Sequence, residues 1–131
     1  MDIGKKEVLY IEDDSYNMLV VRHLFRKKLP QLKLLESATV EAGLECASRE
    51  RPCLILMDLK FIGMDGYEGL TELRRRPETR HIPVWAVSAS VMDDEIERAK
   101  EAGFDAYISK PIEMKTFVER LQAYVDSLPS L

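Results

Sequence analysis

No stretch of this 131-residue sequence stays apolar for the roughly 20 residues that a membrane-spanning helix needs. The opening segment, MDIGKKEV, lacks the apolar core of a secretory signal peptide. Cysteine is scarce, and we expect Cys46 and Cys53 to be buried, reduced thiols in a helix and a strand. The sequence also lacks any Gly-Lys-Ser or Gly-Lys-Thr, which excludes a P-loop enzyme. Together these absences predict a cytoplasmic protein with no membrane contact.

Positive charge is also in short supply. Lys and Arg number 19 against 23 Asp and Glu, for a formal net charge of -4, whereas direct binding to nucleic acid needs a concentrated basic face. The one basic run, Arg74-Arg75-Arg76, falls at the end of a predicted helix, and we expect it to be a solvated helix terminus. With 46% hydrophobic residues, residues 1–131 are predicted to form a single globular domain.

The segment Leu54–Asp58 is the most informative part of the sequence. It is an apolar run that ends on a carboxylate, with Pro52 before it and Gly63 and Gly66 after it. Such a run predicts a strand that is buried on both faces of a parallel sheet. Asp58 would then lie at the carboxyl end of that strand, where open parallel sheets place their ligands. A lone Asp there more often only begins a turn, so the other strand ends decide the interpretation.

Three other predicted strands also end on polar or charged residues. The run at 8–11 is followed by Glu12, Asp13 and Asp14, the run at 83–87 by Ser88, and the run at 106–109 by Lys110 and Pro111. Because the carboxyl ends of parallel strands meet at one edge of a sheet, we expect these side chains to gather around Asp58. Taken singly, each has an ordinary explanation as a helix-start acid, a loop hydroxyl or a surface lysine. Their joint placement indicates a functional site.

Strands and helices alternate five times along the chain. Apolar residues at helical spacing predict helices at 15–29, from Thr39 to about Arg51, at 67–75 and 93–102, and a last helix that includes Phe117 and Leu128 and stops before Pro129. A short run at 33–36 predicts the second strand. This alternation is typical of an α/β protein with helices on both faces of a parallel sheet. We expect the flavodoxin-like, doubly wound fold with five strands in the order 2-1-3-4-5 and five helices, although periodicity alone does not determine that order.

The carboxylates of Glu12, Asp13 and Asp58 would repel one another unless a positive charge neutralises them. An oxygen-only ligand set suits a hard divalent cation, and Mg²⁺ typically binds one or two carboxylates, waters and phosphate oxygens. Lys110 would add a fixed positive charge, and Ser88 a hydroxyl that can hydrogen-bond a phosphoryl oxygen. This set of groups suits phosphoryl transfer, which depends on positioning and electrostatic stabilisation.

Four segments resemble the response-regulator receiver domain, the phosphoacceptor module of two-component signalling. They are LYIEDD, ILMDLKFIGMDGYEGL, VWAVSAS and AGFDAYISKPI, in family order and at family spacing over almost the whole chain. The resemblance implies a stand-alone, chemotaxis-type response regulator that catalyses only its own phosphorylation and dephosphorylation. Asp58 would receive the phosphoryl group from a histidine kinase or a histidine phosphotransfer protein.

The resemblance also assigns roles to the other site residues. It implies that Mg²⁺ is held by Glu12, Asp13, Asp58 and the backbone carbonyl of Lys60, with Asp13 a direct ligand. Ser88 and Lys110 would contact the phosphoryl group, Ser88 and the aromatic Tyr107 would form the switch, and the Lys110–Pro111 peptide bond would be cis. Output would pass to a protein partner through the fourth helix, the last strand and the last helix. The apolar residues that a partner could use there are Val91, Met92, Ile112 and Phe117, with a core position as the alternative for Phe117.

The sequence departs from the family pattern in the loop after Asp58. Phe61-Ile62 stand where the family usually has Met-Pro, so a rigid turn is lost and the path of this loop stays open. Lys60 and Ser90 occupy positions that tune autodephosphorylation in the family, so the lifetime of the phosphoryl group also stays open. For Trp85, in the fourth strand, we expect core packing.

Other interpretations remain at this point. A receiver domain cut from a hybrid kinase or a longer regulator would show the same sequence features. A Mg²⁺-dependent phosphatase with an aspartyl-phosphate intermediate usually carries a second Asp two residues after the nucleophile, where this chain has Lys60. A flavin-binding flavodoxin needs a phosphate-cradling loop after the first strand, where Glu12, Asp13 and Asp14 would repel a phosphate.

Overall fold

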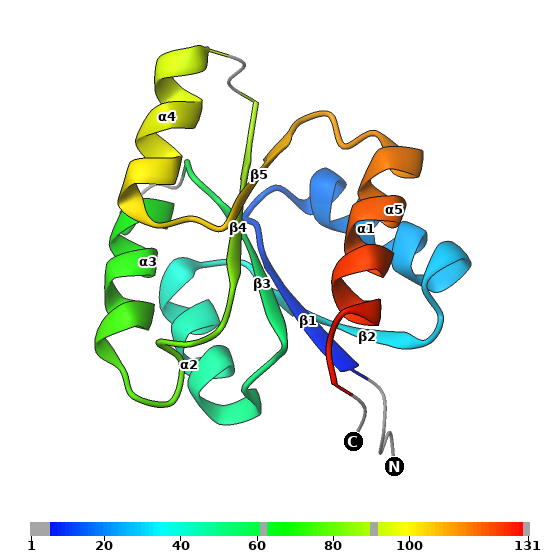
Figure 1. Cartoon of the computed structure of the whole chain (residues 1–131), viewed down its shortest axis with the longest axis horizontal. Coiled ribbons are helices and arrows are strands. Elements are labelled where there is room, and N and C mark those ends of the chain that lie inside the picture. The colour runs from blue at the N-terminus through cyan, green and yellow to red at the C-terminus, as the bar shows by residue number, and fades with distance from the viewer. Residues whose placement is uncertain (1–5, 61–62, 90–91, 130–131) are drawn as a thin grey trace.

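Within residues 6–60, 63–89 and 92–129, which the computed structural model describes, five parallel strands form one sheet (Figure 1). The strands are β1 (Lys6–Ile11), β2 (Leu32–Ser37), β3 (Leu54–Asp58), β4 (Val84–Ser88) and β5 (Ala106–Ser109). Their order across the sheet is β2-β1-β3-β4-β5, and every neighbouring pair is parallel. The predicted strand order is confirmed.

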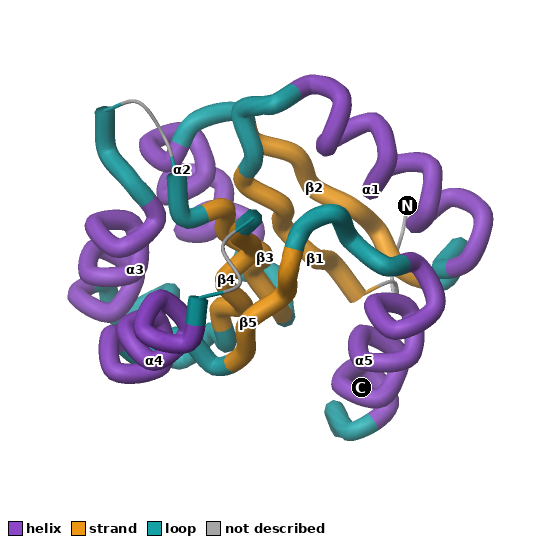
Figure 2. Tube along the Cα trace, turned by 90° about the horizontal axis from the view of Figure 1, so that it is seen from above, coloured by secondary structure: helices purple, strands orange, loops and turns teal. Residues whose placement is uncertain are grey.

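The helices alternate with the strands along the chain and form a layer on each face of the sheet. In the described part of the chain they are α1 (Ser15–Lys28), α2 (Val40–Glu50), α3 (Gly66–Arg75), α4 (Asp93–Ala102) and α5 (Met114–Asp126). Helices α1 and α5 cover one face, and α2, α3 and α4 cover the other (Figures 1 and 2). This is the flavodoxin-like, doubly wound arrangement that the alternating pattern predicts.

Side chains of β1 alternate between the two layers. Val8 and Tyr10 belong to the apolar cluster that includes residues of α1 and α5, and Leu9 and Ile11 belong to the cluster that includes residues of α2, α3 and α4. Next to β1, β3 lies in the middle of the sheet with all of its residues buried. Burial on both faces explains the continuous apolar run of β3, and Asp58 therefore emerges at the centre of the carboxyl edge.

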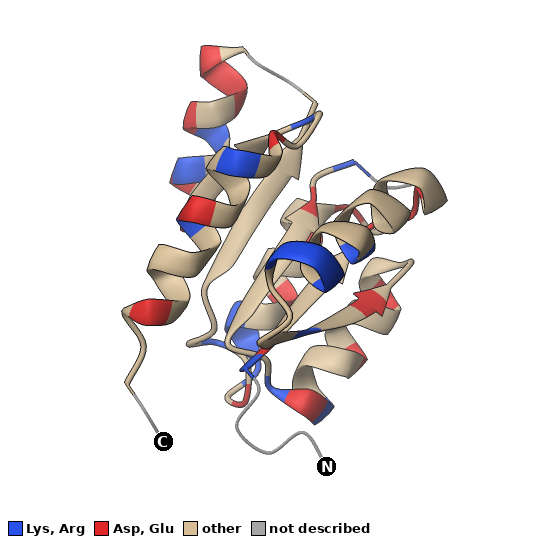
Figure 3. Ribbon diagram, turned by 90° about the vertical axis from the view of Figure 1, so that its right-hand side faces the viewer, with Lys and Arg blue, Asp and Glu red and all other residues tan. Residues whose placement is uncertain are grey.

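Charged residues at the helix ends follow the helix dipole. The first turn of α4 is acidic, the last turn of α1 is basic, and both are visible in Figure 3. The Asp14 side chain caps α1 by accepting a hydrogen bond from the Asn17 backbone N–H at 2.9 Å. Helix α4 is capped at its C-terminal end by Gly103, whose φ of 108° lies in the left-handed region that favours glycine.

The last helix is shorter than predicted, since α5 ends at Asp126 and Leu128 lies beyond it. Leu128 precedes Pro129, and a residue before proline is sterically biased away from the helical region. Leu128 is therefore half-buried outside the helix.

The arginine run lies at the end of α3 as predicted, with Arg74 and Arg75 in the last turn, but two of its three side chains are only half-exposed. Arg74 donates to the Ile82 carbonyl oxygen at 2.7 Å and to Asp105 Oδ2 at 3.2 Å, so it joins the connections that lead into β4 and β5. Arg76 donates to Ser48 Oγ of α2 at 3.1 Å. Both side chains turn back because polar acceptors at the ends of neighbouring elements are within their reach. Arg75 alone stays exposed.

Both cysteines are free thiols whose pKa is raised by burial. Cys46 is buried in α2 as predicted, but Cys53 is half-buried just before β3 and not within the strand. Trp85 is buried in the cluster under α1 and α5, so its predicted core role is confirmed. None of the described helices is both long and apolar enough to cross a membrane.

Candidate functional site

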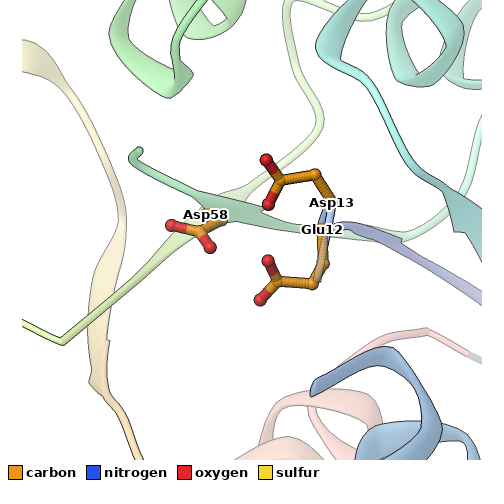
Figure 4. A group of neighbouring side chains, drawn as sticks. All are labelled: Glu12, Asp13 and Asp58. Atoms are coloured by element: carbon orange, nitrogen blue, oxygen red, sulfur yellow. The ribbon is translucent and has the colours of Figure 1, made fainter. Parts of the chain in front are cut away.

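The carboxyl ends of β1 and β3 bring three carboxylates together. Glu12 and Asp13 directly follow β1, and Asp58 is the last residue of the neighbouring β3. One oxygen from each side chain lies within 4.8 Å of the other two. In Figure 4 the Glu12 and Asp13 side chains leave the chain on opposite sides, and both carboxylates face Asp58. Glu12 and Asp58 are buried and Asp13 is exposed, so the cluster meets solvent on the side of Asp13.

Lys110 supplies positive charge to two of these carboxylates. Its Nζ donates to Asp58 Oδ2 at 2.5 Å and lies 2.6 Å from Glu12 Oε1. The Lys110 side chain is only 15% exposed, so solvent screens these pairs weakly. The Lys110 backbone N–H donates to the Ser88 carbonyl at 2.8 Å, which holds the chain after β5 against the end of β4. The Lys110–Pro111 peptide bond is cis.

Both carboxylate oxygens of Glu12 accept hydrogen bonds. The Tyr10 hydroxyl donates to Oε1 at 2.9 Å, and the Asp14 backbone N–H donates to Oε2 at 3.2 Å. Burial by itself raises the pKa of Glu12, but its hydrogen bonds, led by those with Asp58 and Lys110, outweigh burial and lower the pKa. Burial and the Glu12 charge raise the pKa of Tyr10, which is therefore a neutral donor.

The pKa of Asp58 is shifted in the opposite direction to that of Glu12. Its Oδ1 accepts a hydrogen bond from the Lys60 backbone N–H at 3.0 Å. Burial first, and then the adjacent Glu12, raise the pKa of Asp58 to about 6 against the opposing effects of Lys110 and the Lys60 N–H. Two buried carboxylates therefore share one ammonium group, and a further positive charge would let both ionise together.

The donor set of this cluster fits a divalent cation. Its side-chain donors are all carboxylate oxygens, the ligands that hard divalent cations take in proteins. The exposed Asp13 gives an ion access from solvent, while the buried Glu12 and Asp58 are fixed by their hydrogen bonds. The site therefore has the composition and the geometry of a divalent-metal centre next to a buried, strand-end aspartate.

Ser88 and Tyr107 lie on the two strands that follow β3 in the sheet. Ser88 is buried at the end of β4, one residue after Val87, the register partner of Asp58. Tyr107 lies on β5, is half-buried and packs against the cluster under α2, α3 and α4. The structure thus brings Ser88 to the same edge as Asp58, and it places Tyr107 on the adjacent strand.

The residues predicted to face an output partner have mixed outcomes. Met92 is 62% exposed and Ile112 is half-buried. Phe117 is only 2% exposed and belongs to the apolar cluster under α1 and α5, so the core position is confirmed for this residue. The expectations for Phe61-Ile62, Ser90 and Val91 concern positions outside the described residues.

Sequence reasoning missed two residues that shape the site. Tyr10 reads as a plain core residue of a strand, although its spacing of two from Glu12 places both side chains on one side of β1. A Cβ on Gly66 would lie 2.5 Å from the Asp58 carbonyl oxygen and 2.9 Å from Leu59 Cα. Gly66 therefore lets the start of α3 approach the backbone on which Asp58 is carried, and no local sequence pattern reveals that approach.

A comparison with protein families identifies the class of this protein. The family model described as the response regulator receiver domain matches residues 8–122. The chain therefore belongs to the response regulator receiver domains, the phosphoacceptors of two-component signalling, which interact with histidine kinases and are not conventional enzymes. The resemblance drawn from the four sequence segments is confirmed.

Relatives and solved structures agree with this assignment. The polar-differentiation response regulator DivK of Brucella anthropi is 37% identical over 123 residues, which cover 92% of this chain and 96% of that protein. The receiver domain of the sensor histidine kinase PA1611 of Pseudomonas aeruginosa, crystallised with magnesium in its active-site cleft, is 27% identical and superposes with a TM-score of 0.83 over 94% of this chain and 99% of that one. Vibrio cholerae CheY4, at 19% identity, shares the fold with a TM-score of 0.82 over 91% of this chain and 98% of its own.

Proposed function

We propose that this protein is a phosphorylation switch in which Asp58 accepts a phosphoryl group from a phosphohistidine, with Mg²⁺ bound beside it. The observation that carries the proposal is the position of Asp58. It ends a fully buried central strand, pairs with Lys110 and lies within 4.8 Å of the Glu12 and Asp13 carboxylate oxygens. The donor is a histidine kinase or a histidine phosphotransfer protein, as expected for a receiver domain.

The transfer moves one phosphoryl group between two nucleophiles. A carboxylate oxygen of Asp58 attacks the phosphorus, an O–P bond forms, and the N–P bond of the phosphohistidine breaks. The imidazole nitrogen keeps the electron pair of that bond and takes a proton from solvent. Lys110, held next to Asp58 by its 2.5 Å hydrogen bond, stabilises the negative charge of the phosphoryl oxygens. Ser88 offers its hydroxyl as a further donor at the same edge.

Glu12, Asp13, Asp58 and the Lys60 backbone carbonyl would hold the Mg²⁺ ion. The bound ion supplies positive charge that offsets the three carboxylates and the phosphoryl oxygens. Support comes from the oxygen-only cluster of this chain and from the PA1611 receiver domain, whose cleft binds magnesium. Lys60 already contacts Asp58 through its backbone N–H, which keeps this residue beside the cluster.

Phosphorylation would be read by another protein. We infer that Ser88 moves toward the phosphoryl group, that Tyr107 turns inward in response, and that the surface of α4, β5 and α5 changes its affinity for a partner. The buried Ser88 and the half-buried Tyr107 on adjacent strands support this route. Residues 1–131 would act as a single receiver domain in the cytoplasm, a proposal supported by the match to DivK over 92% of this chain.

The test is intact-mass measurement after incubation with acetyl phosphate. With Mg²⁺ the protein should gain one phosphoryl mass, and with the metal chelated it should gain almost none, because the carboxylates then lack the charge that admits a dianion. Asp58→Asn should gain none under either condition.

Asp126→Asn is the matched control, since it removes an exposed carboxylate at the far end of α5. It should be phosphorylated like the unmodified protein. If Asp58→Asn still gained the phosphoryl mass at the normal rate, the acceptor would have to be another residue and the proposal would fail.

A further inference from the structure

Tyr10 is fully buried, and its hydroxyl contacts a carboxylate of the functional site. It is 0% exposed, and its hydroxyl donates to Glu12 Oε1 at 2.9 Å. The hydrogen bond is itself buried. Burying a polar group in an apolar core costs free energy unless the group is hydrogen-bonded. The Glu12 carboxylate supplies that hydrogen bond for the Tyr10 hydroxyl.

The fold fixes the direction of this hydroxyl. Tyr10 and Glu12 are two residues apart at the end of β1, so their side chains lie on the same side of the sheet. The Tyr10 ring packs in the cluster formed with residues of α1 and α5, among them Val21 and Phe117. The ring is fully buried in this cluster, and from there its hydroxyl donates to the Glu12 carboxylate.

The other two donors to Glu12 differ from Tyr10, since one is shared with Asp58 and the other contacts a different carboxylate oxygen. Lys110 divides its ammonium between Glu12 Oε1 and Asp58 Oδ2, whereas the Asp14 backbone N–H contacts the other Glu12 oxygen at 3.2 Å. If Lys110 moved to a phosphoryl group on Asp58, Glu12 would still have the Tyr10 hydroxyl as a donor. The orientation of Glu12 can thus be kept through the whole reaction.

We propose that Tyr10 is a positioning residue of the metal site, one that holds the Glu12 carboxylate in the orientation that binds Mg²⁺. The inference rests on the proposed function of Asp58 and goes beyond it by assigning a role to a core residue that touches neither metal nor phosphate. Outer hydrogen-bond partners of metal-binding carboxylates typically change metal affinity or activity by 10- to 100-fold. Tyr10 should act at the lower end of that range, because it supports one of several ligands.

The experiment compares Tyr10→Phe with Tyr124→Phe. Each substitution removes one hydroxyl and keeps the ring, and each breaks one hydrogen bond, since Tyr124 donates to the Cys53 carbonyl at 2.8 Å near the opposite end of β3. Isothermal titration with MgCl₂ alone should show that Tyr10→Phe raises the Mg²⁺ dissociation constant about tenfold. Tyr124→Phe should leave that constant unchanged even if it lowers the melting temperature.

The phosphorylation reaction gives a second readout. With acetyl phosphate, Tyr10→Phe should need about tenfold more Mg²⁺ for the half-maximal rate, while its maximal rate at saturating Mg²⁺ stays near normal. In a Glu12→Gln background, adding Tyr10→Phe should change the dissociation constant no further, because Tyr10 acts through the Glu12 carboxylate.

The outcomes separate the two proposals. An unmodified protein that neither binds Mg²⁺ nor gains a phosphoryl group would refute the proposed function. An unmodified protein that does both, with a Tyr10→Phe variant of normal Mg²⁺ affinity, would overturn the role of Tyr10 alone. A full additional loss in the Glu12→Gln background would also overturn it, since Tyr10 would then act by another route.

Discussion

Lys110 Nζ lies within 2.6 Å of carboxylate oxygens from both Glu12 and Asp58. Both carboxylates are almost fully buried, so water solvates neither charge effectively. Removing one partner of a buried ion pair leaves an uncompensated charge, which is more costly than removing the whole pair. The charge balance of the resting site therefore depends on a single side chain.

Lys110→Met should lower the free energy of unfolding without Mg²⁺ by about 3 kcal/mol, because it leaves two buried carboxylates facing each other. Adding Mg²⁺ should restore part of that loss, and the rise in melting temperature with Mg²⁺ should exceed that of the unmodified protein. Denaturant unfolding with and without Mg²⁺ measures both effects. Lys115→Met, at an exposed position in α5, is the control, and an equal loss in the two variants would contradict this account.

At the scale of elements, the start of α3 lies directly against the end of β3. The Gly66 backbone N–H donates to the Leu59 carbonyl at 3.3 Å, and a Cβ at Gly66 would meet backbone atoms of Asp58 and Leu59. A Cβ at Gly69 would instead meet side-chain atoms of Val40 and Met57, at 2.8 and 3.0 Å. Side-chain ends can shift more easily than the backbone that carries Asp58.

Gly66→Ala should therefore destabilise the protein by about 2 kcal/mol, despite the higher helix propensity of alanine. It should also slow phosphorylation by acetyl phosphate, because the backbone at Asp58 must move. Gly69→Ala, in the same helix, should cost less stability and leave the phosphorylation rate near normal. Thermal unfolding and phosphorylation rates measured side by side decide between them, and the reverse ranking would count against the close approach at Gly66.

Across the whole molecule, β4 lies between β3, which carries Asp58, and β5, which belongs to the proposed output surface. Helix α4 has a single buried residue, Ala99, so this helix is held by less apolar packing than α1 or α2. Elements with few buried contacts are the ones that shift at the lowest free-energy cost. A change at Ser88 would therefore reach α4 and β5 before it disturbed the other helices.

Beryllofluoride with Mg²⁺, as a mimic of the phosphoryl group, should shift backbone amide NMR signals from about Ser88 to Phe117 together with those around Asp58. The physical reason is that a charge-assisted hydrogen bond to Ser88 is stronger than the neutral one it replaces. Asp58→Asn with the same additions is the control and should show no such shifts. Changes limited to Glu12, Asp13 and the Asp58 loop would mean that the bound group is not read through this surface.

The fold class and the composition of the site follow from local patterns in the sequence. The apolar run of β3, the alternation of strands and helices, and polar residues at successive strand ends are local patterns. Because parallel strands place their carboxyl ends at one edge, those patterns bring Glu12, Asp13, Asp58 and Lys110 together without knowledge of the strand order. Short-range helix signals, such as the Asp14 cap and Gly103, are also readable because their physics is contained within a few residues.

Contacts between residues far apart in the chain depend on how the helices and strands pack together. The return of Arg74 and Arg76 to neighbouring elements and the backbone approach at Gly66 each depend on which elements become neighbours. Spacing could put Tyr10 on the same side as Glu12, but whether its hydroxyl meets a carboxylate depends on how α1 and α5 pack around the ring. Such contacts are set by the fit of whole layers, and no window of the sequence contains that information.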